Sequence, residues 1–236
     1  MKLIDIVTVS RKVFFVFVDE CNRSYRSGAD LSLYREVIDI HNNTEIEFSK
    51  KICDELFVSK IHNTLLAWNM NQRGARLADK ETIKNSISLI VGQLNDLNNY
   101  KLEPGFEMNG NVENLLKTVF LNLKIMESKR RIVGVSKAMH FILPNLIMPI
   151  DSKYTMDSFY GYNKYDNIPE REFKTFLNIF TRTVTIVNRL NLTQDDVDSE
   201  KWNTSVPKLI DNAIIGCSRY IDAHDISEII SLISNK

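Results

Sequence analysis

The stretch RIVGVSKAMHFILPNLIMPIDSKYTMDSFYG, residues 131–161, contains the features on which the expected helical fold depends. An apolar segment leads to Asp151, and residues 152–160 then have the composition of a short helix that Gly161 ends. As the N-cap of this helix, the Asp151 carboxylate would accept backbone N–H groups at the positive end of the helix dipole. We expect an aspartate that either stabilises positive charge beside an apolar wall or only caps a helix.

A run of basic residues precedes Gly134 at the start of the same stretch. The glycine predicts a tight turn, followed by a helix that begins at Val135 or Ser136. Outward-pointing backbone N–H groups beside cations are suited to a phosphate, which gives a set of candidate nucleic-acid contacts. These candidates are Lys129, Arg130, Arg131, Gly134 and Ser136. Alternatively, the cations stabilise the C-terminal end of a helix over 111–128 and bind nothing.

The order of these features resembles the helix-hairpin-helix DNA glycosylases. The residues that carry the resemblance are VGVSKA (133–138), MPIDSKY (148–154) and FYG (159–161). It implies that a hairpin turn at 133–135 grips DNA phosphates through backbone amides, that Lys137 is the Schiff-base nucleophile and that Asp151 assists it. The sequence departs from the family pattern in having one hairpin glycine and a short, fourteen-residue interval from Lys137 to Asp151.

The chemistry implied by the resemblance is base excision on double-stranded DNA, as a glycosylase and AP lyase without a cofactor. An amine that attacks the anomeric carbon of a flipped nucleotide must be desolvated and partly neutral, with a carboxylate nearby. Two other functions stay open. One is a non-enzymatic all-α interaction protein in which Asp151 only caps its helix, and the other is a DNA-binding module of the same fold without catalysis.

Outside this stretch, apolar residues recur at intervals of three and four, which predicts an all-α protein. Residues 1–110 form a mostly helical N-terminal part, residues 111–190 the core, and residues 191–236 a set of acidic C-terminal helices, together one compact unit. Residues 3–18 are rich in β-branched and aromatic side chains, so they are either a short β element or a buried helix. The expected helices cover 31–41, 45–69, 79–99, 111–128, 170–190, 206–222 and 224–234.

The charge of the chain is balanced overall but uneven along it. Thirty basic and thirty acidic residues cancel, so the composition does not indicate a nucleic-acid or membrane partner. Residues 117–153 nevertheless hold seven basic and two acidic side chains, whereas residues 191–236 hold eight acidic and four basic ones. Three widely spaced cysteines and an apolar run of only six residues at 13–18 favour a cytoplasmic protein with reduced thiols and no membrane span.

A second group of candidate residues lies outside the central stretch or beside its lysine. Trp68 with Arg73 and Arg76 could stack on bases and hold phosphates, or else mark the end of a helix that packs against the core. His140, three residues after Lys137, and Tyr160 are candidate pocket residues; otherwise they pack in or near the core. The histidines show no metal-ligand spacing, so no metal is expected.

Overall fold

The computed structural model describes residues 2–24, 29–72, 74–162, 166–199, 201–225, 227–228 and 230–231. Over these residues the protein is all-α, as predicted, and contains no β-strand. The helices are α1 (Leu3–Val7), α2 (Arg11–Ser24), α3 (Ala29–Asn42), α4 (Phe48–Ile52), α5 (Glu55–Ala67), α6 (Lys80–Leu89), α7 (Val91–Asn98), α8 (Gly110–Asn122), α9 (Ile132–Ile142), α10 (Tyr154–Tyr160), α11 (Pro169–Leu190), the 3₁₀ helix η1 (Gln194–Asp196) and α12 (Val206–Ala223).

The N-terminal residues are helical, so the β element considered for residues 3–18 is wrong. In α2, the buried side chains Val13, Phe14, Phe17 and Val18 recur at helical spacing and form one face. This face packs along α12, and the two backbones come very close at Gly216. β-branched and aromatic residues therefore mark a buried helix here, because burial outweighs their preference for strands.

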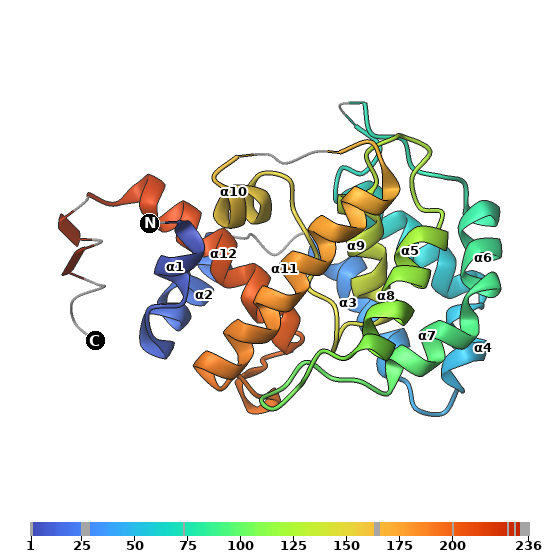
Figure 1. Cartoon of the computed structure of the whole chain (residues 1–236), viewed down its shortest axis with the longest axis horizontal. Helices are drawn as coiled ribbons and strands as arrows, with labels where there is room; N and C mark the ends of the chain where they lie inside the picture. Colours follow the sequence, from blue (N-terminus) through green and yellow to red (C-terminus); the bar gives the residue numbers. More distant parts are fainter. Residues whose placement is uncertain are drawn as a thin grey trace.

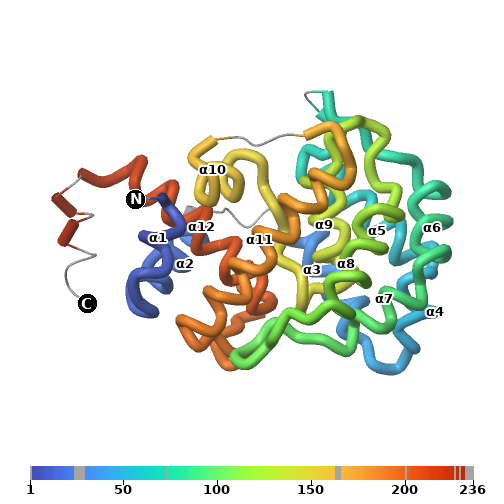
Figure 2. Tube along the Cα trace, in the orientation of Figure 1, coloured from blue at the N-terminus to red at the C-terminus, as the bar shows by residue number. Residues whose placement is uncertain are grey.

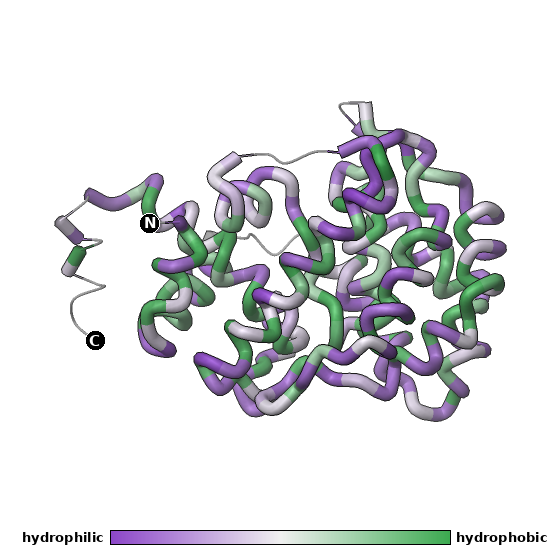
Figure 3. The backbone as a smooth tube through the Cα atoms, in the orientation of Figure 1, coloured by the Kyte–Doolittle hydropathy of each residue, from purple (hydrophilic) through white to green (hydrophobic). Residues whose placement is uncertain are grey.

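Figure 1 shows two groups of helices, α1, α2 and α12 at one end and α3 to α9 at the other. The long helix α11 crosses between them and packs against α8, α9 and α12 (Figures 1 and 2). Its buried residues include Phe173, Phe176, Phe180, Val184 and Val187, at intervals of three and four. Hydrophobic and hydrophilic residues alternate along the peripheral helices, as amphipathic helices require (Figure 3). Among the described helices, none has the length and apolar character needed to cross a membrane.

The central helix α9 is buried along nearly its whole length, and it carries Lys137. The turn predicted at Gly134, with residues 133–135 as a hairpin, is wrong because α9 already begins at Ile132. The glycine is used for packing: a Cβ atom there would lie 2.3 Å from the Met126 sulfur. Gly134, which the local sequence assigns to a turn, is therefore explained by the close contact between α9 and the segment after α8.

The N-terminus of α9 is capped by a carboxylate from another helix. Glu172 of α11 is buried, and its Oε1 atom accepts the backbone N–H groups of Arg131 at 2.8 Å and Ile132 at 3.2 Å. Two of the helix's free N–H groups are satisfied in this way. The two N–H groups just before the predicted phosphate-binding turn at 133–135 are thus bound by a side chain of the protein.

Candidate functional site

The candidate site is a cavity of about 220 Å³ where α9, α12, the end of α5 and residues 149–154 meet. Its walls include Trp68, Lys137, Asp151, Lys208 and Asp211. This volume is below the roughly 300–1,000 Å³ typical of pockets for drug-sized ligands. The cavity therefore suits a small group, such as one sugar of a larger molecule.

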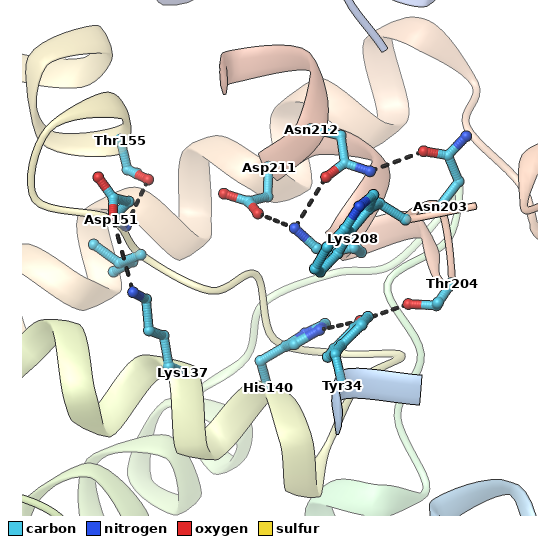
Figure 4. Close-up of polar contacts among 12 residues, drawn as sticks. Tyr34, Lys137, His140, Asp151, Thr155, Asn203, Thr204, Lys208, Asp211 and Asn212 are labelled. Atoms are coloured by element: carbon cyan, nitrogen blue, oxygen red, sulfur yellow. Dashed lines mark hydrogen bonds and ion pairs between the residues drawn. The ribbon is translucent and has the colours of Figure 1, made fainter. Parts of the chain in front are cut away.

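Lys137 and Asp151, the two residues predicted to act together, face each other across this cavity (Figure 4). The Nζ atom of Lys137 lies 3.8 Å from Oδ2 of Asp151, and the side chains are 8% and 30% exposed. The hydroxyl of Ser136 accepts the backbone N–H of Ile150 at 3.1 Å, which ties the segment before Asp151 to α9. Ser136, a predicted phosphate contact, is thus buried and helps to hold Lys137 and Asp151 opposite each other.

Asp151 accepts backbone N–H groups, as predicted, but it is not the N-cap of the next helix, because that position is Lys153. Its Oδ1 atom accepts the N–H groups of Lys153 at 2.8 Å and Tyr154 at 3.1 Å, and its own N–H donates to Thr155 Oγ1 at 2.9 Å. The helix that follows, α10, begins at Tyr154 and ends at Gly161, whose φ of 78° is left-handed. One carboxylate oxygen therefore holds the turn before α10 while the other faces Lys137.

The environment of Lys137 lowers its pKa. Burial lowers the pKa of Lys137, and the carboxylates of Asp151 and Asp211 partly oppose this effect. The Nζ atom also lies 5.4 Å from the ring centroid of Trp68, so the amine is enclosed by an aromatic wall. An amine whose pKa is lowered by burial is more often neutral, and so more nucleophilic, than an exposed one.

Both tryptophans of the chain line the cavity. Trp68 follows the last residue of α5, and Trp202 precedes α12; their ring centroids are 6.4 Å apart. Trp68 therefore lies against the Lys137–Asp151 segment in the described structure. Nothing in the sequence links Trp202 to the Lys137–Asp151 segment. The tertiary packing of the chain brings Trp202, which lies just before α12, to the cavity.

The cavity residues that the sequence did not indicate include a polar group on α12. Lys208 Nζ lies 2.5 Å from Asp211 Oδ2 and 2.9 Å from Asn212 Oδ1, and all three side chains are buried. Lys208 Nζ also lies 5.7 Å from the Trp68 ring centroid and 5.5 Å from that of Trp202. Polar residues at spacing i, i+3 and i+4 inside the otherwise apolar VPKLIDNAIIG were the available signal.

The predicted nucleic-acid contacts at the start of α9 do not line the cavity. Lys129 and Arg130 are exposed. Arg131 has a structural role: its Nη2 atom donates to the carbonyl oxygens of Phe120 at 3.0 Å and Leu121 at 3.3 Å, at the end of α8. This matches the alternative in which a cation stabilises the C-terminal end of that helix.

The two predicted arginine contacts after α5 are also outside the cavity. Arg76 is exposed, and its carbonyl oxygen accepts the N–H of Glu127 at 2.9 Å. Arg73 lies outside the described residues. Of the loop that follows α5, Trp68 and Asn69 are the residues that the structure brings to the cavity.

His140 belongs to the core rather than to the pocket. Its Nδ1 atom donates to the Ile147 carbonyl at 2.7 Å, so Nε2 accepts from the Tyr34 hydroxyl at 2.8 Å. The Tyr34 oxygen is in turn 2.5 Å from Thr204 Oγ1 (Figure 4). Burial lowers the pKa of His140 to about 3, which keeps the ring neutral. This fits the core-histidine alternative.

Tyr160 is likewise absent from the cavity lining. Its hydroxyl donates to Asn178 Oδ1 at 3.2 Å, whereas Tyr154 is the tyrosine that lines the cavity. Within the described residues, no group of three or more His, Cys, Asp or Glu side chains is arranged to hold a metal ion. The three cysteines are free thiols, and none of them lines the cavity.

Comparisons with known protein families, with curated proteins and with solved structures found no match to this chain.

Proposed function

We propose that this protein is a DNA glycosylase and lyase in which Lys137 is the nucleophile and Asp151 the assisting carboxylate. The observation that carries the proposal is a buried lysine with a lowered pKa, 3.8 Å from a carboxylate, in a cavity that both side chains line. The choice of DNA as substrate comes from the resemblance of residues 133–161 to the helix-hairpin-helix glycosylases.

In the proposed reaction the neutral amine of Lys137 attacks C1′ of a flipped nucleotide, and the bond from C1′ to the base breaks with its electron pair leaving on the base. Positive charge develops on the sugar in this step. The Asp151 carboxylate, fixed by two backbone N–H groups, is close enough to stabilise that charge. The cavity accepts the sugar, and the base and phosphates remain near its mouth.

The test is covalent trapping of the lysine on an abasic site. We expect borohydride to trap the wild-type protein on a duplex that contains one abasic site, because hydride reduces the imine to a stable amine. Lys137→Gln removes the nucleophile and should abolish the adduct. Lys117→Gln is the matched control: Lys117 is exposed on α8, does not line the cavity and should leave trapping unchanged. Trapping that persists in Lys137→Gln would contradict the proposed role of this residue.

The exposed cations before α9 are expected to contribute to DNA binding through phosphates. Replacing both Lys129 and Arg130 by alanine should weaken duplex binding and reduce the slope of log Kd against log salt concentration by about 2, since each phosphate contact contributes close to one. Fluorescence anisotropy with a labelled duplex over a range of salt concentrations measures this. An unchanged slope would place the DNA on another surface.

A second candidate is a non-enzymatic helical interaction protein. The observation that favours it is that two charged side chains of this region are bound within the chain: Glu172 holds the N-terminus of α9, and Lys208 is paired with Asp211. In that case neither trapping nor salt-sensitive duplex binding will be observed. Salt-sensitive binding without trapping would instead indicate a DNA-binding module without catalysis.

A further inference from the structure

Asp211 is a second carboxylate in the cavity, on a different helix from Asp151. Its side chain is 6% exposed, and its Oδ2 atom is paired with Lys208 Nζ at 2.5 Å. Among the described residues, its Oδ1 atom has no hydrogen-bond partner. Figure 4 shows this oxygen pointing away from Lys208, toward the side of the cavity where Lys137 and Asp151 lie. A buried carboxylate thus keeps one oxygen for whatever occupies the cavity.

The neighbours of Asp211 hold it in one orientation. Lys208 Nζ is fixed by Asn212 Oδ1 as well as by Asp211, and the Asn212 amide donates to Asn203 Oδ1 at 2.8 Å. The two tryptophan rings enclose the lysine's ammonium from the other side. Because every partner of Lys208 is itself anchored, the carboxylate cannot turn its free oxygen away without breaking this network.

The two carboxylates of the cavity have different environments. Asp151 is 30% exposed and accepts two backbone N–H groups, which suits a fixed electrostatic role. Asp211 is buried, and this burial raises its pKa, with Lys208 opposing the effect. When two carboxyl groups in one site differ in this way, they can divide electrostatic and proton-transfer roles between them.

We propose that Asp211 is the general base of the cavity, with Lys208 and Asn212 as its positioning residues, an inference that rests on the proposed lyase function. Asp211 would act in the elimination step that follows attachment of Lys137 to the abasic sugar. In that step Asp151 stabilises the positive charge on the sugar, and Asp211 removes the proton from C2′.

The steps balance without an additional reagent. The Lys137 amine adds to the C1′ aldehyde, and the adduct takes up a proton from solvent and loses water to give a protonated imine. Asp211 Oδ1 takes a proton from C2′, and the C–H electron pair forms the C1′–C2′ double bond of an enamine. That electron density then expels the 3′-phosphate, as the C3′–O bond breaks with its pair on oxygen. Water hydrolyses the remaining imine and releases Lys137.

The experiment separates imine formation from strand cleavage in Asp211→Asn. We expect borohydride trapping to be retained, because Lys137 and Asp151 are intact, and strand cleavage to fall by roughly 10²- to 10⁴-fold, the usual contribution of a general base. Deuterium at C2′ of the abasic site should slow cleavage more in the variant than in the wild type, because proton removal becomes rate-limiting. Asp222→Asn, an exposed position on the same helix, is the matched control and should cleave normally.

Each outcome has a separate meaning. Asp211→Asn that cleaves at the wild-type rate overturns the role of Asp211 and leaves Lys137 as the nucleophile. Loss of both trapping and cleavage in a variant with a wild-type circular dichroism spectrum also overturns it, since Asp211 would then be needed before the imine forms. A wild-type protein that is never trapped overturns the lyase function itself, and with it this inference.

Discussion

Gly216→Ala is expected to lower the free energy of unfolding strongly. A Cβ atom at residue 216 would lie 1.8 Å from the carbonyl oxygen of Phe17 and 2.7 Å from its carbonyl carbon. These are backbone atoms of α2, so no side chain can rotate to relieve the clash, and α2 would have to move away from α12. Phe14 and Phe17 are fully buried in this contact. Ordinary overpacking of a core costs about 1–3 kcal/mol, and displacement of a whole helix should cost more. The free energy of unfolding of a typical domain is only roughly 5–15 kcal/mol.

The matched control is Gly92→Ala in α7. A Cβ atom there has nothing within 4 Å, and the residue is helical, so alanine should leave stability unchanged or raise it by up to about 1 kcal/mol. Urea unfolding followed by circular dichroism at 222 nm measures both variants. Equal midpoints for Gly216→Ala and the wild type would mean that α2 and α12 do not touch as the structure has them.

The helical class of the protein follows from its sequence because apolar spacing is a local property. The helix expected from residue 79 is an example: α6 begins at Lys80, and the Asp79 carboxylate accepts the N–H of Thr82 at 2.7 Å. Glycines were harder to interpret. Gly134 and Gly216 are both required by close packing inside helices, and a contact with residue 126 or residue 17 cannot be read from the neighbouring sequence.

The difference between local and tertiary information also decides how much of the candidate site could be predicted. Lys137 and Asp151 are on adjacent segments, and a resemblance of about thirty residues was enough to single them out. Lys208 and Asp211 are more than fifty residues further along the chain, in a segment that the sequence characterises only as acidic. Their place beside Lys137 depends on how α12 packs, which is a tertiary property. The predicted phosphate-binding turn at 133–135 is wrong because these residues are already inside α9, and Glu172 reaches the start of that helix from α11.

The buried pair on α12 gives the second large expected effect. Lys208→Met leaves the Asp211 carboxylate in the interior without its cation, and we expect a loss of about 3–5 kcal/mol in the free energy of unfolding. Asp211→Leu, which strands the lysine, should cost a similar amount. The two changes together remove both charges, and the double variant should be far more stable than either single one, because apolar residues of similar volume often replace a buried ion pair at no cost.

Urea unfolding of the four proteins measures this coupling, and simple additivity of the two single losses would show that the residues do not act as a pair.

The double variant also separates the effect of the pair on stability from its effect on strand cleavage. Lys137, Asp151 and Trp68 are unchanged in it, so trapping on abasic DNA should remain, while the base assigned to Asp211 is gone and strand cleavage should stay as low as in Asp211→Asn. Recovery of cleavage together with stability would mean that the pair on α12 only holds the cavity in shape.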